Sequence, residues 1–179
     1  MMEINTNTLV NASKVELQNS QIQGIGVYTR VEVKRGHPIL TIDDSRQVTL
    51  DNPLREECGE YEHHCDFLSR GRKVLLKTPE SHLNHSCSPN SFVRTMGDRR
   101  ILFAMHDIGA GKEVTIDYSI NSSGGDNFDC FCGSLECRNV IEANFFNLPK
   151  DWMLKYMTFL DTWFVDEHLD QVLKELIPF

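Results

Sequence analysis

The hydrophobic pattern of the chain changes about four-fifths of the way along its length. Before that point, apolar residues form short runs or alternate with polar ones, a pattern typical of β-strands. Turn residues such as Gly97-Asp98 and residues 109–111 separate some of these segments. Because the segments are too short and too irregularly spaced for a β-α-β array, they predict small, mostly antiparallel sheets. The predicted strands lie at residues 15–17, 25–33, 39–42, 74–76, 91–93, 101–105 and 114–116.

From Pro149 onward, apolar residues recur at intervals of three and four, which predicts two amphipathic helices. The first runs from Trp152 to Phe164 and the second from Leu169 to Ile177. Proline suits the first turn of a helix, where its missing N–H costs nothing. The two helices either pack on the β core or offer an apolar face to a homodimer partner or a docked substrate. An uncovered stripe with two tryptophans would be costly in water.

Length, composition and charge limit the class of protein. The chain has 179 residues, 40% apolar and 25% charged, which fits one globular domain. Its apolar runs are far shorter than the roughly 18 residues that cross a bilayer. A net charge of −8 argues against a protein that coats nucleic acid and permits a basic partner. The polar N-terminus predicts an intracellular protein, cytoplasmic or nuclear and not secreted, whose cysteines are thiols or metal ligands.

Three cysteines within eight residues, Cys130, Cys132 and Cys137, predict a structural zinc site rather than three unrelated buried thiols. Such a site needs a fourth ligand to complete a tetrahedron of thiolates or histidines. Spacing alone leaves this ligand open. The segment from Cys58 to Cys65 is either part of a second metal site or a solvent-facing loop with ordinary thiols. The candidates for the fourth ligand are Cys58, Cys65, Cys87, His63, His64 and His85.

Four ordered motifs carry a resemblance to a known family. Residues 82–90, His-Leu-Asn-His-Ser-Cys-Ser-Pro-Asn, closely resemble the "NHSCxPN" signature of SET-domain protein methyltransferases. Residues 24–28 resemble the glycine loop of that family, and residues 108–118 resemble its "DIxxGEELTxDY" block. The spacing of residues 130–137 is similar to the family's post-SET "CxCxxxxC". Because four motifs occur in the required order, the match is far more specific than a lone Gly-x-Gly.

The resemblance implies a mostly β fold of small antiparallel sheets with a C-terminal pseudoknot, followed by the two helices. It divides the chain into a SET domain at 15–119 with a variable insert at 44–80, a post-SET zinc segment at 120–140 and a helical extension at 141–179. It also implies that Cys87 completes the zinc site with Cys130, Cys132 and Cys137. Zinc bound there would hold the C-terminal segment against the cofactor pocket, because Cys87 lies close to Asn84 and His85 in sequence.

The implied reaction is transfer of a methyl group from S-adenosylmethionine to a lysine amine of a protein. Tyr118 matches the catalytic tyrosine of the family. The residues that match its cofactor-binding positions are Ile25, Gly26, Tyr28, Asn84, His85, Tyr118 and Phe131.

Two features of this sequence affect the choice of substrate and product. Ile116 occupies the position two before the catalytic tyrosine, where the family usually has Phe or Tyr, so the aliphatic side chain favours di- or trimethylation. The insert is rich in acidic residues, which suits a basic lysine-containing protein, histone-like or other. We expect neither direct nucleic-acid contact nor a membrane.

Two other functions fit parts of the sequence. The first is a SET-like module that has lost turnover and serves as a zinc-stabilised binding domain. The second is a thiol hydrolase that uses Cys87 with His85. The intact Asn84, His85 and Tyr118 argue against the first. A zinc-bound thiolate could not act as the nucleophile that the second requires.

Overall fold

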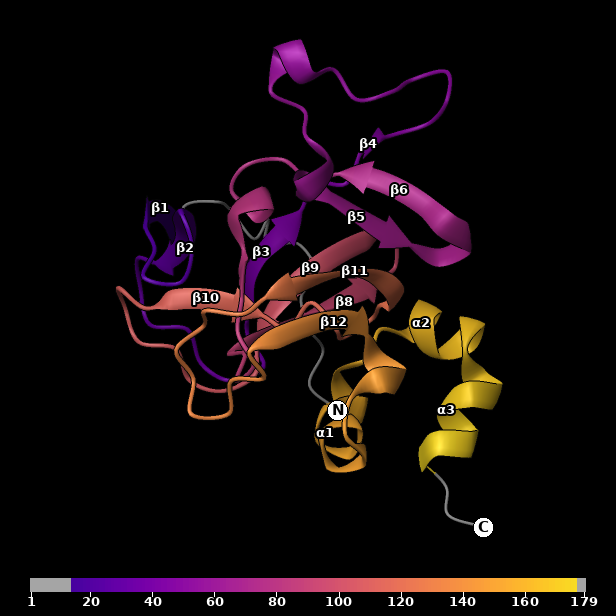
Figure 1. Ribbon diagram of the computed structural model, residues 1–179. Helices are drawn as coiled ribbons and strands as arrows, with labels where there is room; N and C mark the ends of the chain where they lie inside the picture. Colours follow the sequence, from indigo (N-terminus) through magenta and orange to yellow (C-terminus); the bar gives the residue numbers. More distant parts are fainter. Residues whose placement is uncertain (1–13, 177–179) are drawn as a thin grey trace.

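Four small β-sheets form the body of the computed structural model, which describes residues 14–176 (Figure 1). The first sheet has the strand order β1-β2-β10-β7. Its strands β1 and β2 form an antiparallel hairpin around a turn that contains Gly24, whose φ of 51° lies in the left-handed region that favours glycine. Strand β10 pairs antiparallel with β2 and parallel with β7. The bounds are β1 Val15–Asn19, β2 Ile25–Thr29, β7 Asn84–His85 and β10 Glu113–Ile116.

The second sheet has the order β3-β9-β8, with β3 at Pro38–Ile42, β8 at Ser91–Met96 and β9 at Arg99–Ala104. Strand β9 alternates buried and less buried residues along its length, as a strand with one covered face should. The two-residue turn Gly97-Asp98 joins β8 to β9, as the sequence predicts. The inward residues of both sheets form one core. Its fully buried members include Val27, Ile39, Leu102 and Val114.

The insert forms the third sheet, β4-β6-β5, and a projecting loop, residues 48–64, that stands away from the body (Figure 1). Its strands are β4 Arg46–Gln47, β5 Cys65–Leu68 and β6 Arg72–Leu75. The fourth sheet pairs β11, Ser123–Asp129, with β12, Val140–Asn144. All seven residues of β11 are exposed. Strands β4, β5, β7, β11 and β12 are absent from the sequence prediction. In β11 the reason is plain, because Phe128 is its single apolar residue and no apolar pattern marks the strand.

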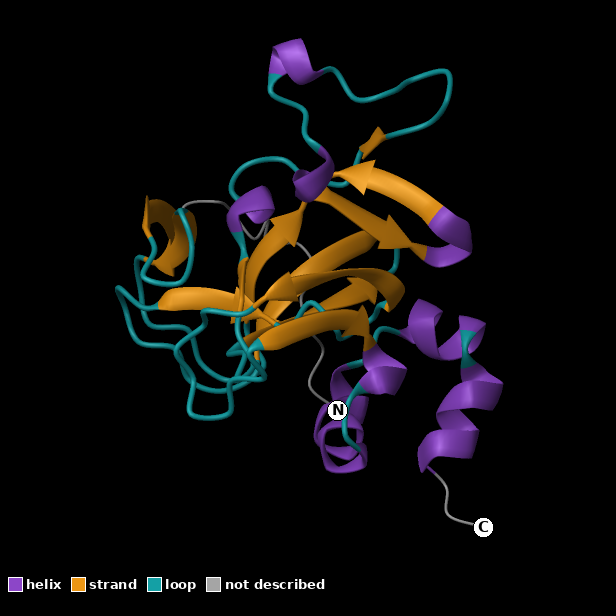
Figure 2. Cartoon of the chain, in the orientation of Figure 1, coloured by secondary structure: helices purple, strands orange, loops and turns teal. Residues whose placement is uncertain are grey.

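The C-terminal helices gather on one side of the sheets (Figure 2). They are α1 Lys150–Tyr156, α2 Thr162–Glu167 and α3 Leu169–Leu176, with a short 3-10 turn at Met157–Phe159. The second predicted helix is α3, although Ile177 lies outside the described residues. The first predicted helix is divided at Leu160, whose ψ of 138° is extended. Asp161 follows it, and its buried carboxylate accepts hydrogen bonds from the backbone N–H and hydroxyl of Thr95 in β8, which fixes the break.

The apolar stripe of the first predicted helix is largely covered within the chain, whereas Leu169 and Leu173 of α3 are exposed. Phe164 is fully buried, and Met153 and Tyr156 are nearly so. They form a second core with Phe145 and Met105, which belong to the β part of the chain. For the first predicted helix, the structure therefore shows the alternative in which the stripe packs on the β core. Within the described residues, no helix is long and apolar enough to span a bilayer.

Replacement of Phe164 by alanine should destabilise the whole fold. The residue is completely buried in the second core, and deletion of a buried aromatic ring leaves a cavity that costs about 3–5 kcal/mol. Leu154→Ala, on the exposed side of α1, is the control and should change the free energy of unfolding by less than about 0.5 kcal/mol. Urea unfolding measures both. Equal effects of the two changes would show that the helices do not stabilise the β core.

Candidate functional site

The glycine loop of β1 and β2 lies against the start of β10. Gly26 is buried, and a Cβ atom at this position would lie 2.2 Å from Oε1 of Glu113. Ile25, by contrast, is 40% exposed. The hydroxyl of Tyr28 lies 3.1 Å from Oε2 of Glu113. A side chain at position 26 would therefore displace the Glu113 carboxylate, and glycine lets the loop and this carboxylate approach closely.

Strand β7 places Asn84 and His85 beside β10. Thr115 pairs with Asn84 and Ile116 with His85, in parallel register. The Asn84 amide nitrogen lies 2.8 Å from Oε1 of Glu113 and 3.2 Å from the carbonyl oxygen of Ile25. The Asn-His motif, the glycine loop and the start of β10 thus meet at one place, although they are far apart in sequence.

Tyr118 lies immediately beyond β10, next to His85. Its backbone N–H donates to Nδ1 of His85 at 3.1 Å, and the two rings meet edge to face with centroids 5.3 Å apart. Its hydroxyl donates to the carbonyl oxygen of Leu83 at 2.8 Å. The residue is 38% exposed, yet desolvation of the hydroxyl raises the pKa of Tyr118 to about 12. The hydroxyl is therefore protonated at neutral pH, with its oxygen lone pairs available to accept a hydrogen bond.

The buried ring of His85 connects Tyr118 to a cluster of thiols. Because Nδ1 accepts the Tyr118 N–H, the neutral ring carries its proton on Nε2, which lies 3.2 Å from Sγ of Cys87. Burial lowers the pKa of His85 to about 4, so the ring is neutral at physiological pH. The ring is therefore held from both sides by the chain itself.

Four sulfur atoms converge behind His85. The Sγ atoms of Cys87, Cys130, Cys132 and Cys137 all lie within 4.8 Å of one another, and those of Cys87 and Cys130 are 3.7 Å apart. A tetrahedral zinc ion with Zn–S bonds of about 2.3 Å has sulfur–sulfur edges of about 3.8 Å, so the four thiols fit zinc in donor type and in spacing. Within residues 14–176, no other group of His, Cys, Asp and Glu brings its ligand atoms as close.

Backbone and side-chain donors point at these sulfurs, as they do at thiolates. The Arg138 backbone N–H donates to Sγ of Cys87 at 3.3 Å, and its Nε lies 3.4 Å from the same sulfur. The guanidinium also donates to Oδ1 of the buried Asp117 at 2.7 Å and lies over the ring of Trp152 at 5.0 Å. Arg138 thus joins the cysteine cluster to the residue before Tyr118 and to helix α1.

The remaining candidates lie elsewhere. Phe131 is 72% exposed, so within the described part of the chain it does not line a closed cofactor pocket. Cys58 is exposed, and Cys65 belongs to β5, outside the group of four. The rings of His63 and His64 meet edge to face with centroids 4.2 Å apart, and the ring of His64 also meets that of His82 edge to face. The hypothesis of a second metal site in the insert gains no support from this arrangement.

Comparison with known proteins agrees with this geometry. The SET domain family matches residues 24–119, which is more than half of the chain. The chain belongs to the SET domain family.

Two relatives show the extent of the similarity. The chain is 33% identical over 139 residues to the histone-lysine N-methyltransferase TRX1 of Oryza sativa subsp. japonica. The aligned region covers 68% of the chain and 13% of that protein. It is 27% identical over 138 residues to the H3 lysine-36 specific histone-lysine N-methyltransferase of Candida albicans, covering 70% of the chain and 16% of the relative. The chain therefore spans a small part of the length of these two relatives.

A solved structure supports the fold alone. The crystal structure of KRYPTONITE in complex with mCHG DNA and SAH superposes with a TM-score of 0.53 and 21% sequence identity. The alignment covers 71% of this chain and 28% of that one. The mostly β architecture that the SET resemblance implies is thereby confirmed.

Sequence reasoning missed three residues that organise the site of this SET domain. Glu113 joins three segments, and Asp117 and Arg138 form a buried ion pair next to Tyr118. Glu113 and Asp117 stand inside the quoted motif, and Arg138 directly follows Cys137. Their positions in or next to the motifs were the one sign in the sequence that they could belong to the site. Their contacts could not be predicted, because they involve segments that are distant in sequence.

We expect the purified protein to contain one zinc ion per chain, because the four thiols match a closed tetrahedral site. Cys87→Ser should lower the zinc content severalfold, since it removes the ligand that bridges to the SET core. Cys58→Ser, at an exposed thiol outside the group, is the matched control and should retain zinc. Elemental analysis by mass spectrometry measures both. Full zinc content in the Cys87 variant would contradict the assignment.

Proposed function

We propose that this SET domain transfers methyl groups from S-adenosylmethionine to the side-chain amine of a lysine in a protein substrate. The observation that carries the proposal is the position of Tyr118. Its backbone is tied to His85 of the Asn-His motif, and its hydroxyl is held by the Leu83 carbonyl. The SET family and the relatives named as histone-lysine methyltransferases support the same reaction.

The glycine loop and the Asn-His motif would hold the cofactor. S-adenosylmethionine supplies a methyl group on a positively charged sulfur. Ile25 and Gly26 would bind the cofactor through their backbone groups. At Gly26 no side chain covers the backbone, and the Glu113 carboxylate occupies the space that a Cβ atom would fill. Asn84 and His85 would contribute from strand β7, and Tyr28 anchors the loop through Glu113. Phe131 stays a proposed cofactor contact that needs its exposed ring to be covered when ligand binds.

Tyr118 would orient the lysine amine. Free lysine has a pKa of about 10.4, so the ammonium must lose a proton before it can attack. The Tyr118 hydroxyl is neutral and donates its own proton to Leu83, so its oxygen can accept a hydrogen bond from the amine. With its pKa at about 12, Tyr118 serves as a positioning hydrogen-bond acceptor in the resting site rather than as an ionised base.

The zinc ion would be structural. A four-thiolate site has no open coordination position, so its contribution is to join Cys87 to the segment from Cys130 to Cys137. His85 and Arg138 carry this constraint to Tyr118 and Asp117. We propose that 120–140 is the post-SET zinc segment. We also propose that 15–119 is the SET domain and 141–179 a helical extension.

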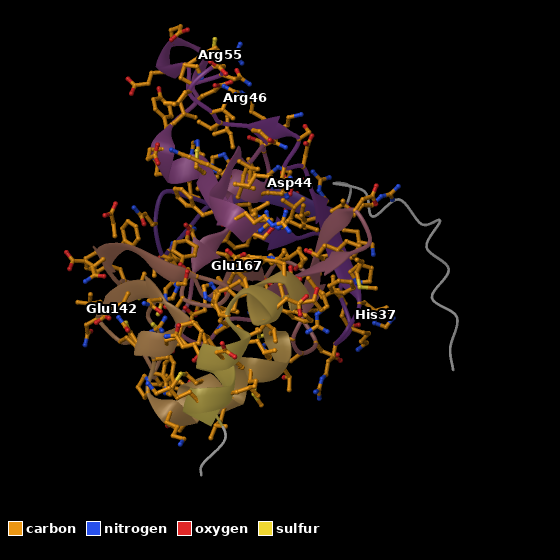
Figure 3. The ribbon with its side chains drawn as sticks, turned by 90° about the vertical axis from the view of Figure 1, so that its right-hand side faces the viewer. His37, Asp44, Arg46, Arg55, Glu142 and Glu167 are labelled. Carbon is orange, nitrogen blue, oxygen red and sulfur yellow. The ribbon has the colours of Figure 1, made fainter. Side chains whose placement is uncertain are left out.

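The substrate is proposed to be a basic lysine-containing protein, histone or other, in the nucleus or cytoplasm. The relatives support this class more strongly than the charge of the insert does. Residues 44–80 contain eight acidic and six basic residues, a net charge of −2. Several of the acidic side chains are already paired, for example Glu60 with Arg46 and Arg55, whose guanidinium groups hold the pKa of Glu60 at about 2. Figure 3 labels the two arginines, which lie close together in the insert.

The acidic residues of the insert that remain without an ion pair in the described structure lie mainly on its projecting loop. Asp51, Glu56 and Glu57 are all exposed there. A basic substrate would therefore meet free negative charge at the loop rather than along the whole insert. A homodimer through the helices is a weaker proposal, because the apolar stripe of the first predicted helix is largely used within the chain.

Tyr118→Phe should lower the methylation rate at least about 100-fold, the scale of one well-placed catalytic group. Binding of S-adenosylhomocysteine should change little, because the ring remains. Tyr156→Phe, which removes a hydroxyl in helix α1, is the matched control. Transfer of radiolabelled methyl groups to a panel of basic proteins, with the site located by mass spectrometry, measures the effect. Near-normal transfer by the Tyr118 variant would defeat the role. Cofactor binding without any transfer by the wild type would favour an inactive binding module.

Removal of zinc by a strong chelator should weaken cofactor binding and turnover together. The reason is that His85 and Arg138 link the cysteine cluster to the cofactor side and to Tyr118. Calorimetric binding of S-adenosylhomocysteine reports the first effect independently of activity, and re-addition of zinc should restore both. Full activity in protein verified to be free of zinc would refute this coupling.

A further inference from the structure

The carboxylate of Glu113 lies at the meeting point of the glycine loop, the Asn-His motif and β10. Its oxygens accept hydrogen bonds from the hydroxyl of Ser20 at 2.8 and 3.0 Å and from the Asn84 amide at 2.8 Å. The Tyr28 hydroxyl is 3.1 Å away. The Glu113 carboxylate also lies directly beneath Gly26, where it occupies the space that a side chain would fill.

All of these donors are electrically neutral. Within residues 14–176, no Lys, Arg or His side chain lies within 4.0 Å of the Glu113 carboxylate. By contrast, the buried Asp117 and Glu60 each have a guanidinium partner. A half-buried carboxylate held only by neutral groups keeps its negative charge uncompensated, and it therefore attracts a cation in its surroundings.

We propose that Glu113 is the counter-charge of the bound cofactor, so that this site discriminates the cationic sulfonium of the methyl donor from the neutral thioether of the product. The proposal rests on the proposed methyl transfer and identifies a specificity-determining residue for it. S-adenosylmethionine carries one more positive charge than S-adenosylhomocysteine, and the two ligands otherwise differ by a methyl group. A fixed negative charge next to the loop therefore stabilises the donor more than the product.

A purely structural role for Glu113 makes a different prediction. If the carboxylate only braces the glycine loop against Asn84, its loss would weaken both ligands to the same extent. If the charge itself acts on the ligand, the donor loses more affinity than the product. The ratio of the two dissociation constants separates these roles.

The test is calorimetric binding of S-adenosylmethionine and S-adenosylhomocysteine to wild type and Glu113→Gln, with folding checked by thermal unfolding. We expect the affinity for S-adenosylmethionine to fall about 10-fold and that for S-adenosylhomocysteine less than about 3-fold, as a partly screened charge pair at close range allows. Glu113→Asp keeps the charge and should keep the wild-type ratio. Glu32→Gln, which removes an exposed carboxylate paired with Lys34, is the matched control and should change neither affinity.

An equal loss for both ligands in Glu113→Gln would overturn the proposal and leave only the bracing role. If this variant does not fold, the salt dependence of binding to the wild type still tests the role of the charge. Added salt should weaken binding of the cationic donor more than binding of the product. Equal salt dependence of the two ligands would then overturn it. Failure of the wild type to bind either ligand would refute the proposed function itself, an outcome distinct from an unchanged ratio.

Discussion

The parallel pairing of β7 with β10 is the constraint on which the site depends. It places Asn84 beside Thr115 and His85 beside Ile116, so that Tyr118 emerges next to the buried imidazole. Asn90 strengthens this arrangement, because its side chain accepts the Thr115 N–H at 2.9 Å and donates to the Glu113 carbonyl at 2.7 Å. Parallel strands need a crossover connection rather than a tight turn. Two distant motifs therefore meet only when the sheets between them have folded.

Behind this pairing, a buried polar network connects Tyr118 with the cysteine cluster. Asp117 is fully buried, and its charge is compensated by Arg138, which follows the last cysteine of the cluster. Loss of one partner of such a pair leaves an uncompensated charge, at a cost of about 3–5 kcal/mol. The imidazole of His85 provides a second connection, from the backbone of Tyr118 to Cys87. The cysteine cluster and Tyr118 are therefore parts of one network.

The sequence was a good guide to the core strands and a poor one to exposed elements. Strands β2, β3, β9 and β10 were predictable because their buried residues leave apolar runs or alternation. Strand β11 was not, since all of its residues are exposed. The helix expected at Trp152 to Phe164 is interrupted because Asp161 bonds to β8, a tertiary interaction without a local signal. The acidic insert looked like a free negative surface, but much of its charge is paired in three dimensions.

What the sequence determined by itself was the set of reactive groups: the Asn-His string, Tyr118 and the cysteines at 130, 132 and 137, whose types and spacing are local properties. From spacing alone the fourth thiol stayed open, and the tertiary structure brings Cys87 into the group while leaving Cys58 and Cys65 outside it. Only the tertiary structure assigned neutral donors to Glu113 and a cation to Asp117. The physical reason is that electrostatic environments depend on distances between segments, which burial and strand pairing set and which no local pattern records.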